Sequence, residues 1–153
     1  MPMVYYWEQM MMTLPTGREP ITNRPLVQYA ALVLLGVLVV QGYTALLADS
    51  RITALTAVLL LVVAAYALVF TARHRTSLRI RACASLTVHL ITYALVVGSF
   101  WVHAALLLLA GQRESLDAGW SGPVLSMSVL WGIGLAVHAW GALRTRGYDD
   151  VAV

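Results

Sequence analysis

Two apolar stretches near the start of the chain decide its fold. Residues 25–47 read PLVQYAALVLLGVLVVQGYTALL, and residues 52–72 read ITALTAVLLLVVAAYALVFTA, with no charged side chain in either. A helix rises 1.5 Å per residue, so about 20 residues cross a hydrocarbon core of roughly 30 Å. Asp49, Ser50 and Arg51 lie between the two stretches and leave room only for a tight turn. Residues 25–72 therefore predict a first transmembrane hairpin.

The second half of the chain repeats this arrangement. Residues 82–110 form an apolar run that has no Asp, Glu, Lys or Arg and contains His89 and His103, residues 111–122 are polar, and residues 124–143 form a further apolar run behind Pro123. Proline is tolerated in the first turn of a helix, so it suits the start of a fourth span. We expect a second hairpin over residues 82–143, with its first helix continuing outward to carry Arg79 and Arg81. The predicted fold is an all-α integral membrane protein with four transmembrane helices.

Composition supports lipid as the main solvent. The chain is 60% hydrophobic and 11% charged, which leaves too little polar surface to cover a soluble globule of 153 residues. Its basic residues are all Arg and do not form a patch on a folded polar surface, so nucleic-acid binding is not expected. The single cysteine, Cys83, has no partner for a disulfide and no metal-binding spacing.

The arginines predict the orientation. Four lie in a basic connector over residues 73–81, namely Arg73, Arg75, Arg79 and Arg81. Residues 1–24 and the tail 144–153 carry four more, whereas the two predicted turns carry Arg51 and Arg113. By the positive-inside rule, the connector and both termini are expected in the cytoplasm, with residues 1–24 cytoplasmic or interfacial. Trp120 and Trp140 are expected as interface anchors at opposite ends of the last span.

Three histidines lie inside the apolar runs, where ionisable groups are rare. His89 and His103 are spaced so that they share one face of a helix, along with Tyr93. The antiparallel hairpin places His138 at a depth similar to that of His89. Trp131, Gly134 and His138 recur at helical spacing, and Gly132 and Gly134 predict a close approach of the two helix backbones.

The same stretch resembles a known family. Arg79 and Arg81, then HLITY at residues 89–93, a short turn, and WGIGLAVHA at residues 131–139 are similar to the 2TM domain family of small prokaryotic membrane proteins. The resemblance covers about residues 79–143 and implies two helices, alone or attached to signalling proteins such as sensor histidine kinases. Val97-Gly98-Ser99 and Ser121-Gly122-Pro123 depart from the family pattern, which weakens a shared binding function more than a shared fold.

Several functions remain open at this point. The main expectation is a subunit without catalytic activity that packs against a larger membrane complex or itself in a prokaryotic cytoplasmic membrane. The alternative is a haem b or quinone-linked anchor in which His89 and His138 ligate the iron, with His103 and Met127 as a further ligand pair. In the absence of a cofactor, His89 and His138 would bond each other, Tyr93, Thr87 or a backbone carbonyl, and His103 would lie near Trp101. A module of a signalling system is a second alternative. The spans contain no Asp or Glu, which argues against a pump, and no nucleophile–base pair or phosphate loop predicts an enzyme.

Overall fold

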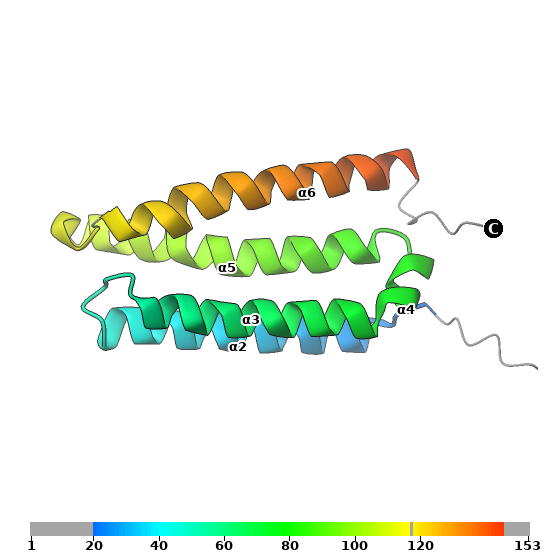
Figure 1. Ribbon diagram of the computed structural model, residues 1–153, viewed down its shortest axis with the longest axis horizontal. Helices are drawn as coiled ribbons and strands as arrows, with labels where there is room; N and C mark the ends of the chain where they lie inside the picture. Colours follow the sequence, from blue (N-terminus) through cyan, green and yellow to red (C-terminus); the bar gives the residue numbers. More distant parts are fainter. Residues whose placement is uncertain (1–19, 117, 146–153) are drawn as a thin grey trace, which may run out of the picture.

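Four helices long and apolar enough to span a membrane dominate the computed structural model, which describes residues 20–116 and 118–145. They are α2 (Asn23–Leu46), α3 (Ala54–Arg73), α5 (Ala84–Leu109), and a last helix in which the π-helical turn η3 (Gly122–Ser126) runs into α6 (Met127–Arg144) (Figure 1). No strand occurs in these two ranges. For these residues the prediction of an all-helical chain with four helices long and apolar enough to cross a membrane is confirmed. The expectations for residues 1–19 and for the tail beyond residue 145 fall outside the described residues.

Consecutive long helices run in opposite directions. The turn between α2 and α3 and the segment between α5 and α6 lie at one end of the molecule, and the start of α2, the short helix α4 (Arg75–Ile80) and the end of α6 lie at the other (Figure 1). Two 3₁₀ turns, η1 (Arg113–Ser115) and η2 (Ala118–Trp120), form most of the segment before the last helix. We call the end with the α2–α3 turn the turn end, and the end with the short helix α4 the α4 end.

The contact between α2 and α3 is close at one point. A Cβ added to Gly36 would lie 2.8 Å from Cγ2 of Val63, so the two backbones approach at a place where only glycine fits. At the turn end, Thr53 and Thr56 form a capping box that satisfies amide groups at the start of α3. In lipid, small residues allow helices to approach closely. Backbone polar groups at helix ends need hydrogen-bond partners within the protein, because lipid offers none.

The core lies where α2 packs between α3 and α5. Tyr29 of α2 has no exposed surface and stacks on Phe70 and Tyr66 of α3, with ring centroids 4.4 Å and 5.7 Å apart. Thr92 of α5 donates its hydroxyl proton to the carbonyl of Val88, so the Tyr29 hydroxyl donates to Thr92 Oγ1. This group ties three of the four long helices together.

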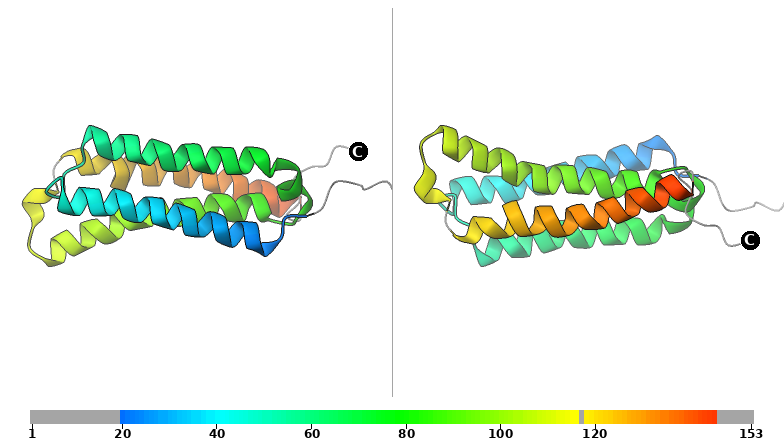
Figure 2. Two further views of the ribbon diagram at one scale, coloured as in Figure 1. Left: turned by 90° about the horizontal axis from the view of Figure 1, so that it is seen from below. Right: turned by 90° about the horizontal axis from the view of Figure 1, so that it is seen from above.

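The fourth long helix stands apart from the other three. Among the described elements the backbone of α6 lies close to α5 and the adjoining η3 and not to α2 or α3, although the side chains of Met127 and Trp131 reach toward the core. None of the described residues of α6 is buried. Seen from below, α2 and α3 lie side by side with α5 and α6 behind them (Figure 2). The bundle is therefore open along the flank between α3 and α6.

The basic connector corrects one prediction. We expected the third span to continue outward through Arg81, but α4 ends at Ile80 and α5 begins at Ala84 after a sharp turn. Cys83 takes a left-handed backbone conformation with φ of 58°, which breaks the helix. Arg81 is extended, and its guanidinium donates to the carbonyl of Ile21 at 3.0 Å. This bond fastens the chain before α2 to the α4 end.

Candidate functional site

The contact between α5 and α6 begins with two facing histidines. The imidazole rings of His89 and His138 are stacked with centroids 4.4 Å apart and an interplanar angle of 28°. His89 Nδ1 lies 2.8 Å from the carbonyl oxygen of Ser85, and because a carbonyl only accepts, this nitrogen carries the proton. The backbone carbonyl is one of the partners expected for His89. His138 lies on the exposed side of the contact.

Further along the same contact, Tyr93 meets the start of α6. Its hydroxyl donates to the carbonyl of Ser128 at 3.3 Å, and its ring meets the edge of Trp131. A Cβ at Gly132 would lie 3.5 Å from the Tyr93 hydroxyl, so this glycine lies at the contact. Gly134, expected at the same contact, is exposed and would have no atom within 4 Å of an added Cβ, because it points away from α5.

Ser128 completes this contact and was not found from the sequence. Its hydroxyl donates to the carbonyl of Val124 at 2.6 Å and accepts from the indole N–H of Trp101 at 3.0 Å. Trp101 is thus bonded to α6, and the tryptophan whose ring meets His103 is Trp120. Ser128 could have been recognised from the sequence as a serine in an apolar run that lies opposite an aromatic residue of the preceding helix.

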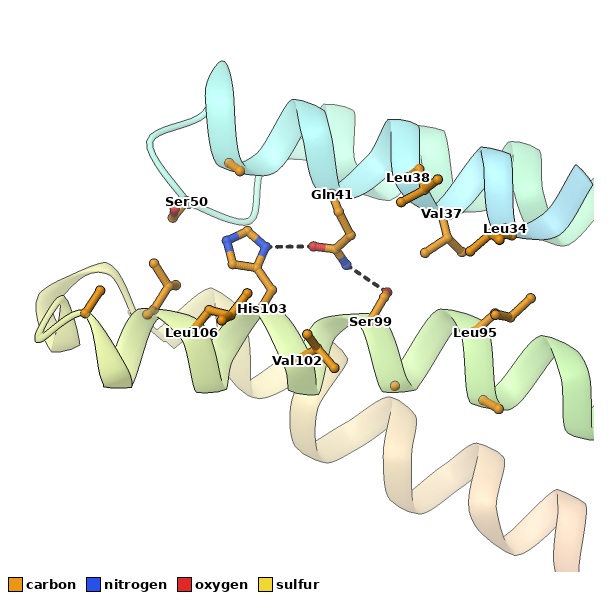
Figure 3. Close-up of a pocket in the computed structure, with 15 residues that line it drawn as sticks. Leu34, Val37, Leu38, Gln41, Ser50, Leu95, Ser99, Val102, His103 and Leu106 are labelled. Carbon is orange, nitrogen blue, oxygen red and sulfur yellow. Dashed lines mark hydrogen bonds between the residues drawn. The ribbon is translucent and has the colours of Figure 1, made fainter. Parts of the chain in front are cut away.

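A second polar cluster joins α2 to α5 and consists of Gln41, Ser99 and His103 (Figure 3). Ser99 donates to the carbonyl of Val96 at 2.7 Å, which uses its one hydroxyl proton. Ser99 Oγ therefore accepts from Gln41 Nε2 at 2.9 Å, and Gln41 Oε1 faces His103 Nδ1 at 2.7 Å. The backbone carbonyl thus sets the direction of the whole chain of bonds: His103 Nδ1 is the protonated nitrogen, and Nε2 carries the lone pair.

His103 is also held from the turn end by Trp120. The two rings meet edge to face with centroids 5.0 Å apart, and the Trp120 indole donates to the carbonyl of Ser50 at 2.8 Å. Trp120 was expected as an interface anchor, but it is 3% exposed because it fills the space between α5 and the first turn. Met127, considered as a ligand partner for His103, packs beside Trp131 toward α3 instead.

An apolar groove of about 730 Å³ runs along this cluster between α2 and α5. Leu34, Leu38, Val102 and Leu106 line its walls and are exposed at its rim, while Gln41, Ser99 and His103 supply polar atoms inside it (Figure 3). The sequence predicted His103 as a candidate ligand but missed Gln41 and Ser99, whose signal was an amide and a hydroxyl within apolar runs. The pairing of α2 with α5 brings them together.

The remaining predicted residues lie at the α4 end. Arg73, Arg75 and Arg79 are exposed, and Arg81 is half-buried against Ile21. The part of the chain that the structure describes contains no group of three or more His, Cys, Asp or Glu side chains placed to hold a metal ion. The candidate site is therefore the α2–α5 groove, with the α5–α6 contact as a packing interface.

Comparisons with known protein families, curated proteins and solved structures find no match for this chain.

Proposed function

We propose that this chain is a small membrane subunit without catalytic activity of its own that packs against a larger membrane complex. The open flank of the bundle carries the proposal. Between α3 and α6 lies a groove of about 370 Å³, lined on one side by Ala57, Leu61 and Ala64 and on the other by Met127 and Trp131. Small residues let a further helix approach closely, and a large aromatic residue beside them adds contact area. A helix from a partner laid in this groove would cover α6, which has no buried residue among those described.

The proposal includes an orientation. In two antiparallel hairpins with both termini cytoplasmic, the α4 end faces the cytoplasm of a prokaryotic cell. The arginines support this, because Arg24, the four of the connector and Arg144 belong to helix ends at the α4 end, and Arg51 and Arg113 belong to the turn end. A bias of this size toward one side sets orientation in small membrane proteins.

Photocrosslinking in the native membrane tests the proposal. A benzophenone side chain replaces Leu61, which lines the α3–α6 groove and is 67% exposed, or Leu35, which is 58% exposed on α2 and lines none of the grooves described above. We expect Leu61→benzoylphenylalanine to give one discrete protein adduct and the matched Leu35 variant to give lipid adducts alone. Lipid adducts alone from both positions would contradict the subunit proposal.

The mass of the adduct separates the kinds of partner. A product of twice the chain mass indicates self-association, and a larger one indicates a different subunit. The resemblance to the 2TM domain family makes a membrane module of a signalling system the second form of this proposal. An adduct to a sensor kinase would support that form, whereas an adduct to a transport or electron-transfer protein would support the accessory-subunit form.

The haem b alternative makes a separate prediction. An iron held by two histidines lies between their ring nitrogens with the macrocycle separating the rings. The stacked rings of His89 and His138 leave no such space at a centroid distance of 4.4 Å, so the geometry favours a packing role. We expect the purified protein to show no Soret or α absorption band. Bands that disappear in both His89→Ala and His138→Ala would restore the haem alternative.

A further inference from the structure

The α2–α5 groove presents an imidazole acceptor that has no hydrogen-bond partner among the described residues. The bonding direction derived above leaves the lone pair on His103 Nε2, and this nitrogen makes no hydrogen bond to any described residue. In Figure 3, the Nδ1 side of the ring faces Gln41 and the other ring nitrogen points toward the turn end near Ser50. A neutral imidazole acceptor in an apolar groove is complemented by a hydrogen-bond donor, and it does not complement a carbonyl, ether or carboxylate.

The groove also has a polar end and an apolar end. Its lining begins at Leu34 and Ala94, near the midpoints of α2 and α5, and reaches Ser50 and Ala110 at the turn end. Helix α5 is 26 residues long, so it exceeds a 30 Å core, and His103 lies about 9 Å from its last residue. This depth places the imidazole just inside the hydrocarbon boundary. From Gln41 to Leu34 the groove then continues about 10 Å toward the bilayer centre.

The groove opens sideways to lipid. All of its lining residues come from α2, α5 and the adjoining turns, and neither α3 nor α6 covers it. Its volume of about 730 Å³ falls in the range of sites for single small ligands. An amphipathic molecule already oriented in the bilayer could enter with its head at His103 and its tail toward Leu34.

We infer that this groove binds a membrane lipid with a free hydroxyl head group, whose O–H donates to His103 Nε2 while its apolar chain lies between α2 and α5. Diacylglycerols and prenylated hydroquinones both have this chemistry. The inference is independent of the proposed subunit role, because the groove lies on α2 and α5 and the proposed partner surface lies on α3 and α6.

The first test changes the ligand and leaves the protein unaltered. The full chain in phosphatidylcholine nanodiscs is titrated with 1,2-dioleoylglycerol or with its 3-O-methyl ether, which differs by loss of the donor, and bound lipid is counted by native mass spectrometry. Loss of one neutral hydrogen bond predicts about three- to tenfold weaker binding of the ether. Equal binding of the two, or binding of neither, overturns the inference for a glycerolipid.

A second arm uses a prenylated hydroquinone and its dimethyl ether in the same assay. A preference for either free hydroxyl compound over its own ether supports the inference, and the pair with the larger ratio identifies the source. Absence of a preference in both pairs overturns the inference as a whole.

Two variants then test whether His103 is the residue that accepts the hydrogen bond from the lipid hydroxyl. His103→Leu removes the acceptor, and we expect it to lower the ratio of alcohol to ether binding to about one. His89→Leu changes a histidine of the same helix outside the groove, and we expect it to keep the ratio of the unaltered protein. A ratio that survives His103→Leu, or that falls equally in both variants, contradicts the assignment to His103.

Discussion

Single polar side chains in this protein are satisfied by short, directed hydrogen bonds. Thr44 and Thr92 donate to the carbonyl four residues earlier in their own helices, and Ser99 donates to the carbonyl three residues earlier. In the described residues, no buried side-chain nitrogen or oxygen lacks a partner. Because Ser99 donates its proton to a backbone carbonyl, its oxygen accepts from the amide nitrogen of Gln41, and the amide oxygen of Gln41 then faces His103 Nδ1. Hydrogen bonds within a helix thus determine which side-chain atoms donate and which accept between helices.

Gln41→Leu tests the bond chain at this scale. The change removes the bonds from Gln41 to Ser99 and to His103, and interhelical hydrogen bonds in membranes are worth about 0.6 kcal/mol on average and about 1.7 at most. We expect the free energy of unfolding in bicelles to fall by about 1–2 kcal/mol. Gln112→Leu, at an exposed turn position, is the matched control and should change it by less than about 0.5 kcal/mol. Equal effects of the two changes would show that Gln41 does not join α2 to α5.

At the scale of the helices, the extent of each span follows from hydropathy, whereas their partners do not. The predicted run over residues 25–47 and the observed α2 (Asn23–Leu46) differ by one or two residues at each end, because a charged or polar residue marks each boundary. The pairing of α2 with α5 was not predicted, since leucine and valine faces are interchangeable in lipid. Gln41 and Ser99 were missed for this reason, although His103 was found because ionisable groups are rare in apolar runs.

The α2–α3 contact offers a test of helix packing. Gly36→Ala forces its Cβ to within 2.8 Å of the buried Val63, whose branched side chain has little freedom to move, and overpacking of this kind costs about 1–3 kcal/mol. We therefore expect Gly36→Ala to lower the free energy of unfolding by about 1–3 kcal/mol. Gly42→Ala, which has no atom within 4 Å of the new Cβ, is the control and should be close to neutral.

A double variant shows whether Val63 is the cause. Gly36→Ala combined with Val63→Ala should lose less stability than the sum of the two single changes, since the second removes the clash created by the first. If the losses in the free energy of unfolding of the two single variants are strictly additive in the double variant, the clash with Val63 is not the cause of the Gly36→Ala effect.

At the scale of the whole molecule, the four helices form an open rather than a closed bundle. One flank, between α2 and α5, carries a polar cluster and the proposed lipid site, and the other, between α3 and α6, carries the proposed partner surface. Charge divides the molecule along its length, because the described arginines concentrate at the α4 end. The sequence predicted that division, since it depends on residue counts in the connecting segments and not on which helices touch.

Thiol labelling in intact cells tests the central claim, that four helices span a membrane with the α4 end in the cytoplasm. Cys83 is the single cysteine and is exposed at the α4 end, and Gln112 is exposed at the turn end. We predict that a membrane-impermeant maleimide labels Cys83 only after permeabilisation, and that Gln112→Cys in a Cys83→Ser background is labelled in intact cells. Labelling of Cys83 in intact cells together with protection of Gln112→Cys would reverse the orientation, and equal accessibility of the two positions would contradict the transmembrane account.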